Sequence, residues 1–312
     1  MSRVVLPDVD LCVAEEGPQV LRGGKQAVLT ATRSAAHLDI LAPDLFFRYW
    51  ETPARLVPHP WYKPPINFAS LTAADGSKWQ LQDGGVGVEW DARILKVYWR
   101  GTIDEWAISA RGRLCRLAGR RPDLFDVQPL RIVGRALHQW LTFPDEEMRP
   151  FEAAIRRGGG GINEKSDAIL AYKFVINVHG NGIEWSNRLR TLLSSGALVF
   201  KQEATLFEFW EREMQPMVHY VPIRSDFSNL IEIVEWALDN DDLALEIAQN
   251  AVAFVRERLH LNRVQCYWAR LLSRYSAIQD FKPTLPPDAV ALSNVASSLW
   301  ALNEKASCDR EP

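Results

Sequence analysis

The chain has 312 residues, of which 47% are hydrophobic and 24% are charged, and its formal net charge at pH 7 is −3. This composition is typical of a soluble globular protein of about two domains, which can bury a core without disulfides or a structural metal. The slight acidic excess argues against general nucleic-acid binding, and the lack of any run of about 18 apolar residues argues against a membrane span.

The cysteines suggest a reducing compartment. Cys12, Cys115, Cys266 and Cys308 are widely scattered, with no C-x-x-C pair and no metal-ligand spacing. We therefore expect thiols rather than a disulfide pair. The first residues lack the apolar stretch of a signal peptide, so the expected location is the cytoplasm.

The first third of the chain predicts a small α/β unit. Strand-like runs at 10–14 and 26–32 are separated by a stretch rich in Gly and Pro. A Pro-rich passage at 57–68 excludes a regular helix, and a short helix is expected at 70–74. We expect a shortened domain over residues 1–93.

From residue 94 onward, strands alternate with helices. The predicted strands are 94–101, 124–130, 171–180, 197–202 and 218–223, and the predicted helices are 107–119, 183–196, 205–214, 226–238, 242–259 and 263–278. Such alternation predicts a doubly wound parallel sheet over 94–280, interrupted by an inserted loop at 143–165 and followed by a peripheral tail over 281–312. Ligands of such sheets sit at the carboxyl ends of the strands.

The strongest candidate site follows the strand at 171–180. Gly180 and Gly182 let the backbone approach a ligand closely, and the start of the next helix can bind a phosphate. Arg188 lies one helical turn after Trp185 and could face a leaving group. A dinucleotide fingerprint needs Gly or Ala where Trp185 stands, which excludes an NAD site. The alternative is an ordinary strand-to-helix turn with Glu184 and Arg188 as a solvated pair.

Other strand ends carry further candidates. Gly101 and Thr102 precede a helix that contains Arg111, within a run of five arginines at 110–122 whose alternative interpretation is a solvated basic face. Glu208 and Asp226 follow later strands and could accept ribose hydroxyls. A helix-surface acid and a helix cap are their alternatives.

Three stretches carry a family resemblance. They are YKFVINVHGNGIEWSNRLRTLLSSGALVFKQ, FEFWEREMQPMVHYVPIRSDFSNL and CYWARLLSRYS, preceded by YWRGT and RRPDLFDV. In this order they resemble glycosyltransferase family 90, which includes fungal capsule-associated proteins, Rumi-type protein O-glucosyltransferases and bacterial lipopolysaccharide glycosyltransferases. The resemblance covers roughly residues 8–278. It implies two Rossmann-like domains of the GT-B type.

The resemblance also implies roles for the candidate residues. Gly101, Thr102 and Arg111 would face the diphosphate of a UDP-sugar donor, and Glu208 and Asp226 would hold its nucleoside. The residues implied for the sugar-nucleotide cradle are Gly180, Gly182, Trp185, Ser186, Asn187 and Arg188, and Arg188 would also stabilise departing UDP. No cofactor and no metal are expected, so the Asp8-x-Asp10 pair is interpreted as a strand edge.

The implied reaction is an inverting transfer of a hexose or xylose to a glycan, lipid-linked or protein hydroxyl. The family's base position falls on Gly17, so Glu16, or its neighbour Glu15, is the candidate base. Because this position departs from the family, the alternative is a non-catalytic sugar-nucleotide-binding or scaffold protein. A module that binds through its basic helix is a third hypothesis.

Two cellular locations are expected. The cytoplasmic side of an inner membrane, with peripheral association, is one expectation. The secretory pathway is the other, if an N-terminal targeting segment is missing.

Overall fold

The structure is a computed structural model. It describes residues 9, 12–13, 28–37, 39–43, 72–73, 79–80, 89–142, 146–151, 168–180, 186 and 188–282. Of the predicted site residues, Glu15, Glu16, Gly182, Trp185 and Asn187 lie outside this set.

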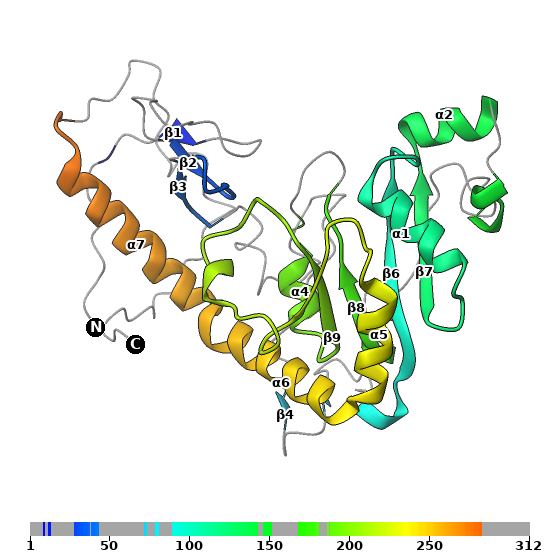
Figure 1. The fold of residues 1–312 in the computed structure, drawn as a ribbon. Coiled ribbons are helices and arrows are strands. Elements are labelled where there is room, and N and C mark those ends of the chain that lie inside the picture. Colours follow the sequence, from blue (N-terminus) through cyan, green and yellow to red (C-terminus); the bar gives the residue numbers. More distant parts are fainter. Residues whose placement is uncertain are drawn as a thin grey trace.

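A parallel sheet of five strands forms the centre of the molecule, in the order β10-β9-β8-β6-β7 (Figure 1). The strands are β6 (Ile94–Ile103), β7 (Phe125–Ile132), β8 (Tyr172–Asn177), β9 (Leu198–Gln202) and β10 (Val221–Ile223). In the middle of β6, Val97, Tyr98 and Trp99 are all buried, as expected for a strand covered on both faces. The prediction of a parallel, Rossmann-like α/β sheet is confirmed.

Helices cover both faces of the sheet. They are α1 (Ala110–Gly119), α2 (Gly134–Thr142), α4 (Leu189–Leu193), α5 (Leu230–Asp239), α6 (Asp241–Arg258) and α7 (Leu261–Ile278). Along β8, Phe174 and Ile176 join a core with α1 and α5, whereas Val175 joins a core with α4 and α7. Because successive strand residues point to opposite faces, the two cores lie on opposite sides of the sheet. Helix α6 contributes to both cores.

Short 3₁₀ helices complete the described part of this unit. They are η4 (Trp90–Ala92), η5 (Glu146–Phe151), η6 (Ala168–Ala171) and η7 (Glu211–Glu213). None of the helices in the described ranges has both the length and the hydropathy that crossing a bilayer requires.

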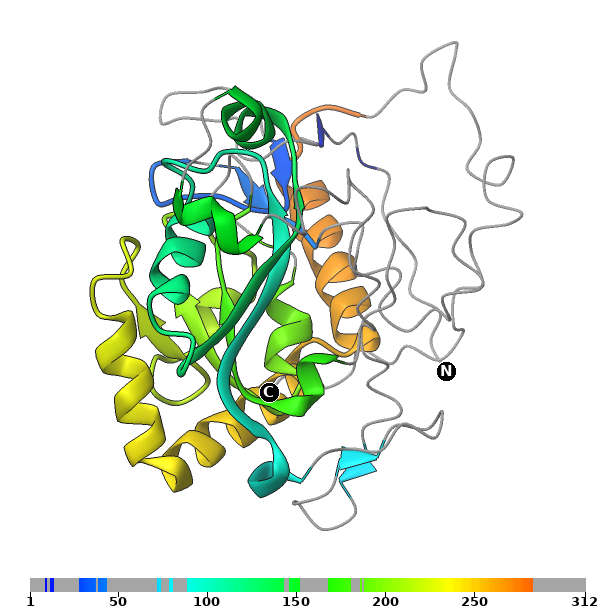
Figure 2. The same ribbon diagram turned by 90° about the vertical axis from the view of Figure 1, so that its right-hand side faces the viewer.

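The N-terminal part contributes a small parallel sheet, β1 (Cys12–Val13), β2 (Val28–Thr30) and β3 (Ile40–Leu41). Arg33, just after β2, pairs with Phe207 in an antiparallel bridge, and the Tyr267 hydroxyl on α7 donates to the carbonyl of Leu41 at 2.7 Å. In both views α7 runs from the large sheet toward this small one (Figures 1 and 2). The two sheets are therefore joined by a bridge and a helix.

Several predicted elements are shorter or different. The helix expected at 205–214 is wrong, because Phe207 is drawn into the bridge with Arg33 and only η7 is helical. The helix expected at 183–196 is described only as α4, and the one expected at 226–238 begins at Leu230. The helix expected at 70–74 is also wrong, because β4 (Thr72–Ala73) pairs with β5 (Trp79–Gln80).

The cysteines divide into two kinds. Cys115, on α1, is a buried free thiol, and burial raises its pKa. Cys266, on α7, is disulfide-bonded. The expectation of unpaired thiols is therefore wrong for Cys266, whose sulfur is held in a disulfide bond.

Candidate active site

The carboxyl ends of β6 and β8 lie next to each other, and the backbone of β6 is distorted there. Its register against β7 shifts between Gly101 and Thr102, an irregularity that re-aims the residues at a strand end. A Cβ on Gly101 would lie 2.5 Å from the buried ring of Trp99, and contacts this short do not occur in folded proteins. Packing of Trp99 is thus a structural reason for glycine here. Its expected contact with a diphosphate stays a prediction.

Arg111 joins the two strand ends. From the first turn of α1, its Nη1 donates to the carbonyl of Thr102 at 2.8 Å and its Nε donates to the carbonyl of His179 at 3.0 Å. Its guanidinium lies 6.0 Å from the centre of the Trp99 ring. A planar guanidinium group that donates to two carbonyls and lies near an aromatic ring has a well-defined orientation.

Arg188 reaches the same place from the start of α4. Its Nη1 donates to the carbonyl of Arg100 on β6. The pKa of Arg111 is lowered to about 10, first by burial and then by the positive charge of Arg188, while the negative charge of Asp104 opposes the change. The two guanidiniums therefore lie close enough to repel each other, and with a pKa of about 10 Arg111 stays protonated at neutral pH. Carbonyl oxygens hold them in place, and an anion between them would relieve the repulsion.

A polar network beneath this pair holds the backbone of β6. The buried guanidinium of Arg100 bonds to the carboxylate of Asp126 at 2.9 Å and to its carbonyl at 2.8 Å. The Tyr172 hydroxyl donates to the other carboxylate oxygen of Asp126, and the ring of Tyr98 lies 4.6 Å from the Arg100 guanidinium. This network positions the carbonyl that holds Arg188.

A small hollow of about 10 Å³ lies at the ends of β8 and β9, next to residues that contact the arginine pair. Its described lining residues are Asn177, His179, Ser186, Leu189, Lys201, Gln202, Ala204, Leu206 and Glu211. The Ser186 hydroxyl accepts a bond from the Arg188 amide at 3.4 Å, and the His179 carbonyl holds Arg111. Two residues that line the hollow therefore contact the arginines, whereas neither Arg111 nor Arg188 is among its described lining residues.

Most of the predicted site residues that the structure describes meet here. Thr102, Arg111, Ser186 and Arg188 are linked by the contacts above, and Gly101 lies in the same stretch of β6. Gly180 directly follows His179. The phosphate argument from a helix N-terminus needs correction, because α4 has only 5 residues. The positive charge of the site comes from arginine side chains instead.

Glu208 and Asp226 have surroundings that the sequence did not indicate. Glu208 is 1% exposed and accepts a hydrogen bond from Trp210 Nε1 at 3.0 Å, so the helix-surface alternative is wrong. Asp226 is exposed in the turn after β10, where it accepts the Ser228 amide at 2.9 Å, a bond that lowers its pKa. Because α5 begins at Leu230 after Asn229, the helix-cap alternative is also wrong. The roles of both acids toward a nucleoside remain predictions.

Sequence reasoning missed several residues that build the site. Asn177, His179 and Asp126 carry contacts or line the hollow, and Trp99 supports Arg111. The available signal was the polar Asn177 at the end of the apolar run FVI. A lone polar residue at the end of a buried parallel strand points toward the ligand edge.

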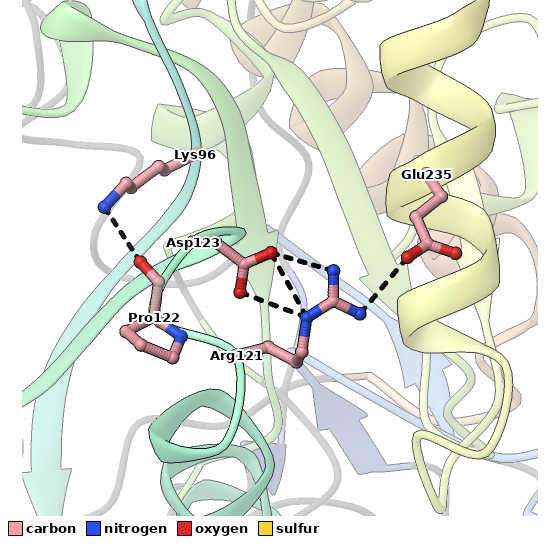
Figure 3. A network of polar contacts seen from close by, with 5 residues as sticks. All are labelled: Lys96, Arg121, Pro122, Asp123 and Glu235. Carbon is pink, nitrogen blue, oxygen red and sulfur yellow. Dashed lines mark hydrogen bonds and ion pairs between the residues drawn. The ribbon is translucent and has the colours of Figure 1, made fainter.

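The arginine-rich run at 110–122 is divided among different tasks. Arg111 turns to the site, and Arg116 donates to the carbonyls of Trp106 and Ala107. Arg121 lies between Asp123 and Glu235, tying the end of α1 to α5, while Lys96 donates to the carbonyl of Pro122 (Figure 3). The run is therefore not one uniform basic face, which weakens the hypothesis of a basic-helix module.

The fold and the site define an α/β protein with a parallel, Rossmann-like sheet that carries two arginines at its carboxyl edge, which is the edge where ligands of such sheets bind. The sequence matches the family model Glycosyl transferase family 90 over residues 2–308. The chain belongs to this family of glycosyltransferases, which confirms the resemblance seen in the sequence.

Individual relatives agree with this assignment. Protein O-glucosyltransferase 2 of Danio rerio is 31% identical over 200 residues, covering 64% of this chain and 36% of that protein. Protein O-glucosyltransferase 1 of Homo sapiens is 26% identical over 282 residues, covering 89% of this chain and 65% of that protein. The chain thus spans between about a third and two thirds of the length of these relatives. Among solved structures, Anabaena Alr3699/HepE in complex with UDP-glucose has a TM-score of 0.41 and 13% identity, over 57% of this chain and 48% of that one.

Proposed function

We propose that the protein is an inverting glycosyltransferase that moves a hexose or xylose from a UDP-sugar to a hydroxyl of a glycan, lipid-linked or protein acceptor. The observation that carries this proposal is the convergence of Arg111 and Arg188 at the carboxyl ends of β6 and β8. Membership of a glycosyltransferase family and the names of the protein O-glucosyltransferase relatives support it.

The arginine pair supplies what the departing diphosphate requires. As the bond between the anomeric carbon and the phosphate oxygen breaks, negative charge accumulates on UDP. Guanidiniums that are already fixed by backbone carbonyls stabilise this charge without having to reorganise. We therefore propose that Arg111 and Arg188 do in this protein what a metal ion does in other transferases.

The other half of the reaction needs a base. The acceptor hydroxyl attacks the anomeric carbon from the face opposite UDP, its proton passes to a carboxylate, and the configuration inverts. We propose Glu16 as this base, with Glu15 as the alternative, on the evidence of sequence alone. We also propose a GT-B arrangement in which residues 94–280 hold the donor and residues 1–93 face the acceptor. The parallel β1–β3 sheet supports this arrangement.

The disulfide at Cys266 bears on location. Disulfides persist in secretory and periplasmic compartments and are rare in the cytoplasm. It therefore favours the secretory alternative over the cytoplasmic one, with or without peripheral membrane contact.

The proposal is tested by calorimetric titration with UDP in EDTA, together with transfer or hydrolysis of radiolabelled UDP-glucose and UDP-xylose. The wild type is expected to bind UDP and to release sugar from one of the two donors. Glu16→Gln is expected to keep the UDP affinity and lose turnover, and Glu15→Gln run in parallel decides between the two carboxylates. Glu257→Gln, an exposed change on α6, is the matched control.

Each outcome has a distinct meaning. UDP binding without any turnover by the wild type would favour the non-catalytic sugar-nucleotide-binding alternative. Failure to bind UDP would refute both functions. Binding that disappears in EDTA would refute the proposal that arginines replace the metal.

A further inference from the structure

Asn177 is the last residue of β8 and the only polar one in the run 174–178. Its side chain is 7% exposed, and its Oδ1 has no hydrogen-bond partner within the described part of the chain. Buried polar atoms are nearly always paired, so an acceptor left without a partner requires an explanation. Asn177 also lines the hollow beside the arginine pair.

The other polar side chains of this hollow already have partners. Gln202 accepts the His179 amide at 3.0 Å and donates to the Ser225 carbonyl at 2.7 Å. Lys201 forms an ion pair with Glu211 at 3.1 Å, with both side chains largely buried. These contacts fix the side chains that line the hollow, and the Asn177 Oδ1 takes part in none of them.

The hollow lies next to the place proposed for the diphosphate. Ser186 and His179 line it, and they contact Arg188 and Arg111 respectively. A ligand held by the two arginines would therefore extend one of its ends toward Asn177. A sugar nucleotide carries hydrogen-bond donors on both sides of its diphosphate.

We propose that Asn177 is a specificity-determining residue of the donor site, whose Oδ1 accepts a hydrogen bond from an O–H or N–H group of the bound nucleotide sugar. The group is the imide N–H of uracil, a ribose hydroxyl or a hydroxyl of the transferred sugar. This inference rests on the proposed function. Its physical basis is that a site built to pair a donor group strongly rejects an analogue without that group, because its own acceptor is then left unpaired.

The variant Asn177→Leu separates this role from a structural one, because the two roles predict different combinations of effects. Leucine is close in size to asparagine and removes an unpaired buried acceptor, so the melting temperature of the ligand-free protein should stay the same or rise. The affinity for the donor should fall at least tenfold in calorimetric titration with UDP and UDP-glucose. Gln249→Leu, which also replaces a side-chain amide by leucine but at an exposed position on α6, should leave the affinity unchanged.

Wild-type titrations identify the group without any variant. CDP lacks the imide N–H, 2′-deoxy-UDP lacks a ribose hydroxyl, and UDP lacks the sugar of UDP-glucose. At least one of these ligands should bind the wild type ten or more times more weakly than its parent. That difference should disappear in Asn177→Leu, or in Asn177→Ala if the leucine variant does not fold.

Other results of these titrations would overturn the inference about Asn177 or the proposed function itself. If the variant melts at a higher temperature and binds UDP and UDP-glucose as the wild type does, Asn177 faces only an ordered water and the inference is overturned. If Arg188→Ala abolishes UDP binding while Asn177→Leu does not change it, the proposed function stands and the inference about Asn177 fails. If the wild type binds no UDP, the proposed function itself fails.

Discussion

Replacing Arg188 by alanine is expected to weaken UDP binding without unfolding the protein. The side chain makes a bond to the Arg100 carbonyl and lies near Arg111, whose pKa its charge lowers. A hydrogen bond to a charged group contributes about 1.5–3 kcal/mol. Since about 1.4 kcal/mol is tenfold in affinity, the Kd should rise roughly 10- to 150-fold.

The ligand-free protein should respond in a different way. Alanine removes the hydrogen bond to the Arg100 carbonyl, which costs about 1 kcal/mol, but it also removes the repulsion between two neighbouring positive charges. The two effects oppose each other, so the free energy of unfolding should change by less than about 1 kcal/mol. Calorimetric titration and urea denaturation of the same samples measure the two quantities.

Two further variants divide the effect into charge and geometry. Arg188→Lys keeps the charge but cannot hold a carbonyl and a phosphate with one planar group, so its Kd should lie between those of wild type and alanine. Arg116→Ala is the matched control, because Arg116 lies on α1 and is held by the carbonyls of Trp106 and Ala107, away from the site. Unchanged UDP affinity in Arg188→Ala, or an equal loss in Arg116→Ala, would refute this account of the site.

Three other changes test the supporting structure. Asp126→Asn removes the charged partner of buried Arg100 and should lower the free energy of unfolding by about 1–3 kcal/mol. It should also weaken UDP binding, because Asp126 helps to position the Arg100 carbonyl that holds Arg188. A normal UDP affinity would contradict this positioning role of Asp126. Gly112→Ala would place a Cβ 2.0 Å from the Trp106 carbonyl oxygen, so urea denaturation should show a free energy of unfolding lower by at least about 1–3 kcal/mol. Gly119→Ala is the matched control on the same helix. A Cβ there meets nothing within 4 Å, so this variant should raise the free energy of unfolding by about 0.5–1 kcal/mol. Burial raises the pKa of the Cys115 thiol, so iodoacetamide at pH 8 should modify Cys115 only after the protein unfolds. Rapid modification of the folded protein would show instead that the thiol is accessible.

The large sheet could be predicted from local pattern. Apolar runs such as 174–176 and the apolar centre of β6 are what a parallel strand covered on both faces requires, and the helices between them show the matching period. The arginines of the site could also be placed near strand ends, because the order of strands and helices decides which residues follow a carboxyl end. The predicted family rested on the same segments.

Other features depended on contacts between distant parts of the chain. Phe207 lies in a segment with helical composition, but its backbone pairs with Arg33, about 170 positions earlier. Glu208 resembled a surface acid until its pairing with Trp210 and its burial were known. The disulfide at Cys266 likewise requires α7 to be in place.

Local periodicity and short motifs in the sequence predict the order of strands and helices and the family, and they place the candidate residues at strand ends. It is the packing of the chain that brings Arg111 and Arg188 together against backbone carbonyls and leaves the Asn177 acceptor without a partner in the described ranges. The burial of a side chain and its hydrogen-bond partners are properties of the whole packed molecule. They exist only once residues separated by many positions have come into contact.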